Sequence, residues 1–298
     1  MVKKQSPKSG SELSDTREIG RKLFVERGLR AKKSFGQCFL ADKNIAKRMA
    51  RECVLEPGSS VLEIGAGTGA LTGPLLDLNA KVVAVERDRD MIPILNASFS
   101  TNVESGQLSI HEADAAACDW SAILDRMPRP RAAVGNLPYQ ITGRLLERAT
   151  CAAAKVDRIV FMVQKEVADR IAAPPGTREY GALSVFMQRS FHIVRRFPVP
   201  PQCFRPQPSV HSTVIVMEPN KPPVEPASNE FRKFVLGSFS ARRKTIRNAW
   251  GGFLPSSLSN DHEELLSEIA ADLGIQLDFR PEQLSPDQFE RAWMQICR

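Results

Sequence analysis

The chain of 298 residues is 42% hydrophobic and 25% charged, which is ordinary for a folded protein of one or two domains that can bury a core without disulfides or a metal. Its net charge of +7 suggests a polyanionic partner without proving one, and it has no apolar run near the roughly 18 residues that cross a membrane. Because its six cysteines and four histidines show no zinc spacing, and residues 1–16 lack the apolar core of a secretory signal, we expect a cytoplasmic protein with no metal site.

The first half of the chain alternates strand and helix patterns. Residues 1–14 are polar and rich in Ser and Lys, so we expect a disordered tail, followed by helices at 17–30 and 45–54. We then expect strands at 61–64, 81–85, 108–111, 132–134 and 158–163, with helices at 70–78, 88–97, 120–126 and 141–154 between them. Such alternation predicts an α/β fold: a Rossmann-like parallel sheet with helices on both faces.

The second half of the chain has a different pattern. Two β-rich segments, 183–199 and 210–217, have no helix between them and predict an antiparallel hairpin at the sheet edge. The proline-rich residues 219–226 resemble a linker, and helical patterns follow at 231–250, 262–273 and 286–297. We therefore expect an α/β domain over 15–220 and a small all-helical domain over 227–298.

A glycine-rich loop joins the first strand to its helix. Gly65, Gly67 and Gly69 allow a tight turn and a close approach of a ligand to backbone N–H groups. Glu86 ends the second strand, where a carboxylate can accept hydrogen bonds from ribose hydroxyls, and Asp114 follows the third, where it can meet an adenine amino group. Together these features predict a site for an adenosine cofactor, although a dinucleotide also fits the loop, and a plain turn with surface acids is the alternative.

The charge near this loop narrows the choice of cofactor. A dinucleotide carries a pyrophosphate, whereas S-adenosylmethionine carries a sulfonium cation that tolerates a nearby carboxylate such as Glu63. The pattern of Glu63, Gly65, Gly67 and Gly69 resembles the first motif of the S-adenosylmethionine-dependent methyltransferases. S-adenosyl-L-methionine is therefore the expected cofactor.

The segment Asn136-Leu137-Pro138-Tyr139 follows the fourth strand and should face the same crevice as the glycine loop. The Asn136 amide oxygen and the Leu137 carbonyl could accept the two N–H groups of an exocyclic amine, with Pro138 fixing the backbone between them. Tyr139 offers a face on which a flipped base can stack. These four residues are our candidates for methylation of a base amine, and a strand-ending turn is the alternative.

Further motifs extend this pattern over most of the chain. They are residues 35–40 (FGQCFL), 136–139 (NLPY), 164–167 (QKEV), 180–185 (YGALSV), 204–208 (FRPQP) and 242–248 (RRKTIRN). In this order they resemble the ribosomal RNA adenine N6,N6-dimethyltransferase family, nearest to its bacterial small-subunit branch. The resemblance runs from about residue 17 to the C-terminus, and makes 15–220 the catalytic domain and 227–298 an RNA-contacting domain.

The resemblance also implies roles for single residues. Gly65, Glu86, Asp114 and Asn136 match cofactor-binding positions of the family. Leu40 and Cys38 match two more, although the family usually has Asn in place of Cys38, whose side chain cannot make the same hydrogen bonds. Phe204 matches an aromatic residue that would hold the target base opposite Tyr139, and a core phenylalanine in a proline-rich loop is the alternative.

The positive charge is concentrated in two short stretches. Residues 1–60 carry a net +7, residues 61–230 are neutral, residues 231–247 carry +6 and residues 248–298 carry −6. We expect RNA phosphates to be bound by one basic group before the first motif and another in the predicted helix 231–250. These candidates are Arg30, Lys32, Lys33, Arg242, Arg243, Lys244 and Arg247.

The resemblance implies two successive methyl transfers to N6 of two adjacent adenines in the 3′-terminal hairpin of small-subunit ribosomal RNA. The expected partner is a pre-ribosomal small subunit during assembly, and with no oligomerisation signal we expect a monomer. Three alternatives remain: a large-subunit dimethylase of the macrolide-resistance type, a DNA adenine methylase, and a binding factor on the same fold that has lost catalysis. The long helical C-terminus disfavours the first, the NLPY variant the second, and intact motifs the third.

Overall fold

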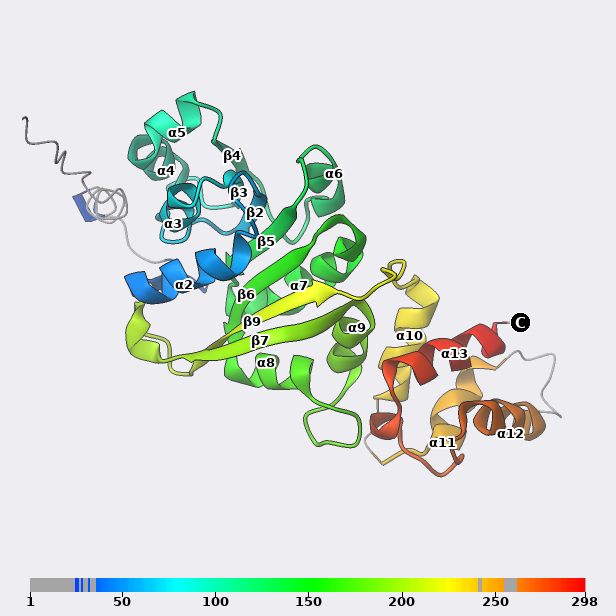
Figure 1. Ribbon diagram of the computed structural model, residues 1–298. Coiled ribbons are helices and arrows are strands. Elements are labelled where there is room, and N and C mark those ends of the chain that lie inside the picture. Colours follow the sequence, from blue (N-terminus) through cyan, green and yellow to red (C-terminus); the bar gives the residue numbers. More distant parts are fainter. Residues whose placement is uncertain are drawn as a thin grey trace, which may run out of the picture.

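The computed structural model describes residues 25–26, 28, 32, 36–240, 243–254 and 262–297, and its centre is a seven-stranded sheet of order β4-β3-β2-β5-β6-β9-β7 (Figure 1). Neighbouring strands from β4 to β6 run parallel, and β9 runs antiparallel to both β6 and β7. The strands are β2 (Ser60–Ile64), β3 (Lys81–Glu86), β4 (Leu108–Glu112), β5 (Arg131–Asn136), β6 (Arg158–Gln164), β7 (Phe191–Val199) and β9 (Ser212–Pro219). The expected α/β class and the edge hairpin are confirmed.

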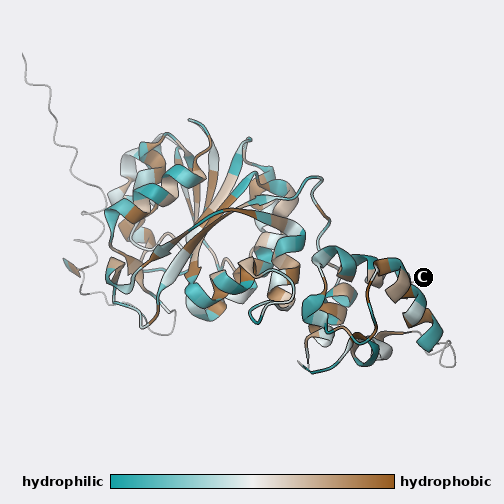
Figure 2. Ribbon diagram, turned by 60° about the horizontal axis from the view of Figure 1, so that its bottom comes forward, coloured by the Kyte–Doolittle hydropathy of each residue, from teal (hydrophilic) through white to brown (hydrophobic). Residues whose placement is uncertain are grey.

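Helices cover both faces of the sheet. Alternate residues of a strand enter opposite cores: Val61 and Val160 pack on one face, Leu62 and Phe161 on the other. The first face is covered by α2 (Lys43–Cys53), α3 (Thr72–Asp77), α4 (Ile92–Ser98) and α5 (Ser100–Glu104). The second is covered by α6 (Trp120–Asp125), α7 (Thr142–Cys151), α8 (Lys165–Ala172) and α9 (Ala182–Ser190). Figure 2 shows mostly hydrophobic residues in the central strands, and helices that carry both hydrophilic and hydrophobic residues.

The order of the strands creates a crevice. From β2 the chain moves outward through β3 and β4, and then returns to the other side of β2 to form β5 and β6. The connections after β2 and β5 therefore leave the sheet in opposite directions. Ligands of open parallel sheets bind at such a switch point, beyond the carboxyl ends of the strands.

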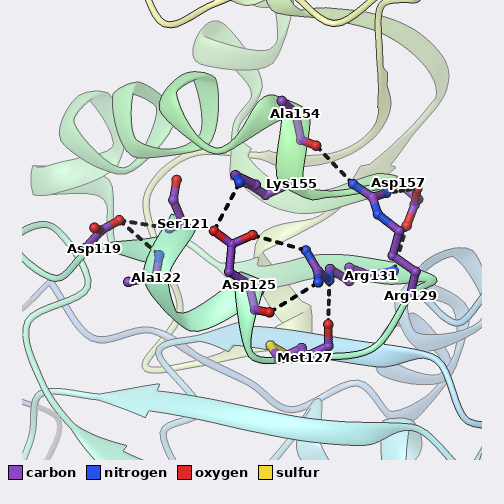
Figure 3. A network of polar contacts seen from close by, with 10 residues as sticks. All are labelled: Asp119, Ser121, Ala122, Asp125, Met127, Arg129, Arg131, Ala154, Lys155 and Asp157. Carbon is purple, nitrogen blue, oxygen red and sulfur yellow. Dashed lines mark hydrogen bonds and ion pairs between the residues drawn. The ribbon is translucent and has the colours of Figure 1, made fainter.

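A polar network at the start of β5 anchors the sheet on the side where the parallel strands begin, opposite their carboxyl ends (Figure 3). Arg131 donates its backbone N–H to Asp157 at 2.7 Å and its Nε to the Met127 carbonyl at 2.6 Å. Arg129 also pairs with Asp157, and Lys155 lies 3.0 Å from Asp125. These contacts anchor the beginning of the strand whose other end carries Asn136.

One expectation about the middle of the chain is wrong, and one helix there was not expected. Residues 183–190, expected as strand, belong to α9, and residues 165–172 form α8, which the sequence did not suggest. In α9 the apolar run around Val185 and Met187 resembles a strand, but the two side chains enter different cores on opposite sides of the helix. The Gly181 N–H donates to Ser184 Oγ at 3.1 Å and marks the start of this helix.

The C-terminal part is helical but differs in detail from the expectation. It contains α10 (Asn229–Ser238), α11 (Ile246–Trp250), α12 (His262–Leu273) and α13 (Pro286–Ile296), packed around the aromatic rings of Phe234, Trp250 and Phe289. The single helix expected over 231–250 is wrong, because α10 ends at Ser238 and α11 begins only at Ile246.

This helical part lies beside α9, with α10 and α13 against that helix (Figure 1). Its core includes Tyr180 and Val185 from the α/β part, and the Tyr180 hydroxyl donates to the Leu284 carbonyl at 2.8 Å. The two parts therefore share one core. The division into two domains at residues 220–227 stays a prediction. None of the described helices is both long and apolar enough to span a membrane.

Candidate active site

The glycine loop after β2 depends on backbone conformations that favour glycine. Gly65, Gly67 and Gly69 have φ values of 73°, 55° and 86°. The Gly67 N–H donates to Glu86 Oε2 at 2.8 Å, which fixes the loop against the end of β3. At Gly69 a Cβ atom would lie 2.4 Å from the Phe99 ring, so neither the backbone nor the space there allows a side chain.

Two acids stand at the ends of neighbouring strands, and both line the cavity beside this loop. Glu86 is buried, and its Oε1 accepts the Asp88 N–H at 2.7 Å. Burial raises its pKa, while hydrogen bonds from Asp88 and Gly67 oppose the rise. Asp114 Oδ1 accepts the Ala116 N–H at 2.9 Å, and its Oδ2 lies 3.3 Å from an Arg87 guanidinium nitrogen. Because a carboxylate oxygen can accept two hydrogen bonds, both acids retain capacity for a ligand.

Glu63 is a third acid on the cavity wall and is almost completely buried. Its Oε2 accepts from Thr72 Oγ1 at 2.7 Å, whereas its Oε1 has no hydrogen-bond partner among the described residues. Burial raises the pKa of Glu63 to about 7, the Thr72 hydrogen bond opposes this, and the charge of Glu86 adds to it. A buried acid with an unsatisfied oxygen favours a cationic ligand, which the sulfonium and amino groups of S-adenosylmethionine provide.

Asn136 ends β5 and faces the same cavity. Its Nδ2 donates to the Cys38 carbonyl at 2.8 Å, so Oδ1 is the atom of the amide left to accept a hydrogen bond from a ligand. The Leu137 N–H donates to the Met162 carbonyl at 3.0 Å, and no described residue donates to the Leu137 carbonyl. The two acceptors that the sequence indicated are therefore available beside the cavity.

Tyr139 lies on the next turn, η2 (Tyr139–Ile141), half-buried on the cavity wall. Its hydroxyl and Ser212 Oγ are 2.8 Å apart. Burial raises the pKa of Tyr139, and the Ser212 hydrogen bond opposes the rise. The Pro138 carbonyl accepts from Thr142 Oγ1 at 2.9 Å, which ties the turn to the start of α7.

The segment around Cys38 forms another wall of the cavity. Cys38 and Leu40 both line it, and Cys38 contacts Asn136 through its backbone carbonyl. This contact does not depend on the Cys38 side chain, so it survives the replacement of the usual Asn. Burial raises the pKa of the Cys38 thiol.

Phe204 lies away from the cavity wall in this structure. Its side chain is fully buried in the hydrophobic core and is not on the cavity wall. It lies in β8 (Phe204–Arg205), which pairs antiparallel with β1 (Phe39–Leu40) in a two-stranded sheet. The structure thus places the ring in the core, and its role beside the target base stays a prediction.

The basic candidates divide into three groups. Lys32 is partly exposed, and its ammonium group lies 2.5 Å from Asp88 Oδ1 and 2.6 Å from Asp90 Oδ2, so its role in RNA binding stays a prediction. Arg243 and Lys244 are exposed on the connection between α10 and α11 rather than in a helix, and Arg247 on α11 pairs with Glu263. Arg30, Lys33 and Arg242 lie outside the described residues.

Several further residues belong to the site although the sequence did not mark them as candidates. Arg87, Gln37 and Gln140 line the cavity, and Asp88 and Ser212 hold residues that do. Asp88 follows Glu86 by two residues, a spacing that could have drawn attention to it. Instead we expected it to begin the helix at 88–97.

A mixed sheet of this order, with a glycine loop and acids at its carboxyl edge, defines a Rossmann-like methyltransferase. The model of the family described as ribosomal RNA adenine dimethylase matches residues 28–285, and the chain belongs to this family. It is accordingly an S-adenosylmethionine-dependent methyltransferase.

Similar proteins carry names that agree with this family. The chain is 41% identical to ribosomal RNA small subunit methyltransferase A of Anaeromyxobacter dehalogenans, over 80% of this chain and 86% of that protein. It is 39% identical to the protein of the same name from Alcanivorax borkumensis, over 86% of each chain. A crystal structure of a dimethyladenosine transferase from Plasmodium falciparum shares the fold, with a TM-score of 0.68 at 22% identity over 86% of this chain and 96% of that one.

Proposed function

We propose that the protein transfers two methyl groups to N6 of each of two adjacent adenines in the 3′-terminal hairpin of small-subunit ribosomal RNA during ribosome assembly. The observation that carries this proposal is the geometry of Asn136. Its amide nitrogen is committed to the Cys38 carbonyl, so its oxygen is left to accept from an amine beside the cofactor cavity. The names of the relatives support small-subunit ribosomal RNA as the substrate.

The Asn136 oxygen and the Leu137 carbonyl solve a chemical problem of the substrate. The lone pair of an adenine amine is delocalised into the ring, which makes the nitrogen a poor nucleophile. Two acceptors that bind its N–H groups favour a pyramidal nitrogen with its lone pair directed away from them. The Tyr139 ring, held by Ser212, provides a surface against which the flipped base stacks.

The cofactor supplies an electrophilic methyl group when it is bound. Glu86 would hold its ribose hydroxyls, Asp114 its adenine amino group, and Glu63 its cationic end. Catalysis then consists mainly of positioning the amine for in-line attack. No histidine lies among the described residues that line the cavity, and none is needed, because the methylated ammonium is acidic and loses its proton after transfer.

Arg243 and Lys244 provide an exposed basic surface for RNA phosphates on the connection between α10 and α11. We extend the proposal to a monomer that works in the cytoplasm on a pre-ribosomal small subunit. A large-subunit dimethylase, a DNA methylase and an inactive binding factor are the competing functions.

The competing functions differ in where the methyl group goes. Labelled S-adenosylmethionine is incubated with the protein and with small subunits, large subunits or duplex DNA that lack adenine methylation. The proposal predicts label in the small-subunit RNA. Label in large-subunit RNA or DNA would instead support the rival enzymes, and binding of small subunits without label would support the inactive factor.

A further inference from the structure

A short segment before α2 forms one wall of the cofactor cavity. We call residues 36–40 the strap, and all five of them line the cavity. At its downstream end the strap is held by main-chain contacts, because β1 pairs with β8 and the Ala41 N–H donates to the Cys203 carbonyl at 2.7 Å. In its middle the Cys38 carbonyl accepts from Asn136.

The upstream end of the strap is held by the side chain of Asp88. Asp88 Oδ2 accepts from Gln37 Nε2 at 2.7 Å, and Oδ1 accepts from the Lys32 ammonium at 2.5 Å. Gln37 and Lys32 are joined in turn, because the Lys32 N–H donates to Gln37 Oε1 at 2.8 Å. Each end of the Gln37 amide is therefore engaged, and the contact orients the whole side chain.

The surroundings of the Asp88 carboxylate favour this contact. Its side chain is only 1% exposed although it carries a charge, and a third hydrogen bond reaches Oδ1 from the Asp90 N–H at 3.1 Å. Burial opposes ionisation, but hydrogen bonds from Lys32 and Gln37 outweigh it and lower the pKa of Asp88. A buried carboxylate with this many donors holds its partners more firmly than an exposed ion pair would.

Asp88 also connects the strap to the rest of the site. Its own N–H donates to Glu86 Oε1, while Glu86 Oε2 accepts from Gly67. A continuous series of hydrogen bonds therefore runs from the glycine loop through Glu86 and Asp88 to Gln37. One residue further along the strap is Cys38, whose carbonyl fixes the Asn136 amide.

We propose that Asp88 is a positioning residue that latches the strap across the cofactor cavity, and so couples cofactor binding at Glu86 to the orientation of Asn136. Asp88 touches neither cofactor nor base in this role. It acts through Gln37 and Lys32, and loss of the latch frees the upstream end of the strap. The inference rests on the proposed cofactor site, and it reassigns Lys32 from RNA binding to closure of that site.

The test uses the full chain and isothermal titration calorimetry with S-adenosylhomocysteine, the unreactive product of the cofactor. Asp88→Asn and Gln37→Leu change the two sides of one contact, and Gln37→Leu leaves the loop after β3 intact if Asp88→Asn fails to fold. We expect each variant to weaken affinity about tenfold, and the double variant to be no weaker than about the worse single variant. Glu112→Gln is the control. Glu112 is an exposed acid at the carboxyl end of β4, the strand next to β3, and it pairs with Arg89. It should bind as the wild type does.

Hydrogen exchange of the cofactor-free protein provides the second measurement. Residues 36–40 should exchange faster in Asp88→Asn and Gln37→Leu than in the wild type, with no change in α7. In steady-state assays the KM for S-adenosylmethionine should rise more than kcat falls.

The latch would be overturned if both variants bound S-adenosylhomocysteine as the wild type does and residues 36–40 exchanged hydrogen at the wild-type rate. It would also be overturned if the losses of affinity added in the double variant, because the two residues would then act separately. A wild type that binds no S-adenosylhomocysteine would instead overturn the proposed cofactor site and the latch with it.

Discussion

Asn136 illustrates how one side chain can serve two partners. Its amide nitrogen is used by the protein, which leaves the oxygen for the substrate. We expect Asn136→Ala to lower kcat about 100-fold, because it removes one acceptor for the amine and the contact that fixes the strap. Affinity for S-adenosylhomocysteine should fall much less.

Steady-state methylation and calorimetry together check this prediction. Asn96→Ala is a suitable control, since Asn96 is exposed on α4 and its amide donates to the Ile92 carbonyl of its own helix. A kcat near that of the wild type in Asn136→Ala would show that the amide has no role in the reaction.

Glu63 makes the stability of the cofactor-free protein depend on pH. Its folded pKa of about 7 lies above its ordinary value of 4.5, so the folded state disfavours the charged form. The free energy of unfolding should therefore fall as pH rises from about 4.5 to about 7, by about 3 kcal/mol, and level off above that. Glu86 on β3 and Cys53 on α2 are the other titratable groups that interact with it.

Urea denaturation across this range tests the effect of Glu63→Gln, which keeps an acceptor for Thr72 but cannot ionise. The variant should lose most of this decline and be more stable than the wild type at pH 8. Equal pH dependence in both proteins would contradict the assigned pKa.

Much of the site could be predicted from the sequence at the level of residues. Gly67, Glu86, Asp114 and Asn136 were identified because each follows or ends a strand, and the carboxyl ends of parallel strands meet at one edge. The ion pair of Lys32 was not foreseen, because its partner Asp88 lies 56 residues away and sequence patterns do not show such distant contacts. The sequence left two roles open for Phe204, because an aromatic residue in a motif can serve the core as well as a ligand.

The glycine loop is the element on which the cofactor site depends most. Gly69→Ala should destabilise the fold by about 2 kcal/mol or more, because φ is 86° and the new Cβ would meet Phe99. Gly143→Ala is the matched control on α7, where a Cβ meets nothing within 4 Å and the exchange should stabilise the helix by about 0.5 kcal/mol. Chemical denaturation measures both, and equal stability of the two variants would contradict this description of the loop.

Elements were predicted well where local pattern and burial agree. The strands β2, β3, β5 and β6 are short apolar runs with both faces covered. These strands and the more exposed β4 were all expected near their observed positions. The start of α9 and the break after α10 were not, because both depend on packing between the α/β part and the helical part. Val185 enters a core that is formed mainly by residues after 230.

For the molecule as a whole, the position of charge matters more than its sum. The exposed pair Arg243 and Lys244 lies on the connection between α10 and α11, while residues 248–298 are acidic. Arg243→Glu with Lys244→Glu should weaken binding of small-subunit RNA and reduce the magnitude of its salt dependence by about 1 to 2. Fluorescence anisotropy at several salt concentrations measures both.

The control for this pair is Lys81→Glu with Arg126→Glu, which changes the charge equally at two exposed residues, at the start of β3 and the end of α6, on the amino-terminal side of the sheet. It should leave RNA binding nearly unchanged. The same loss in both double variants would mean that only net charge matters.

The most direct test of the account is the chemical identity of the product. Small subunits that lack these methyl groups are incubated with the protein and S-adenosylmethionine, and their RNA is digested and analysed by mass spectrometry. The account predicts N6,N6-dimethyladenosine at two adjacent positions of the 3′-terminal hairpin. RNA that remains unmethylated, or that carries only monomethyladenosine or methyl groups elsewhere, would contradict it.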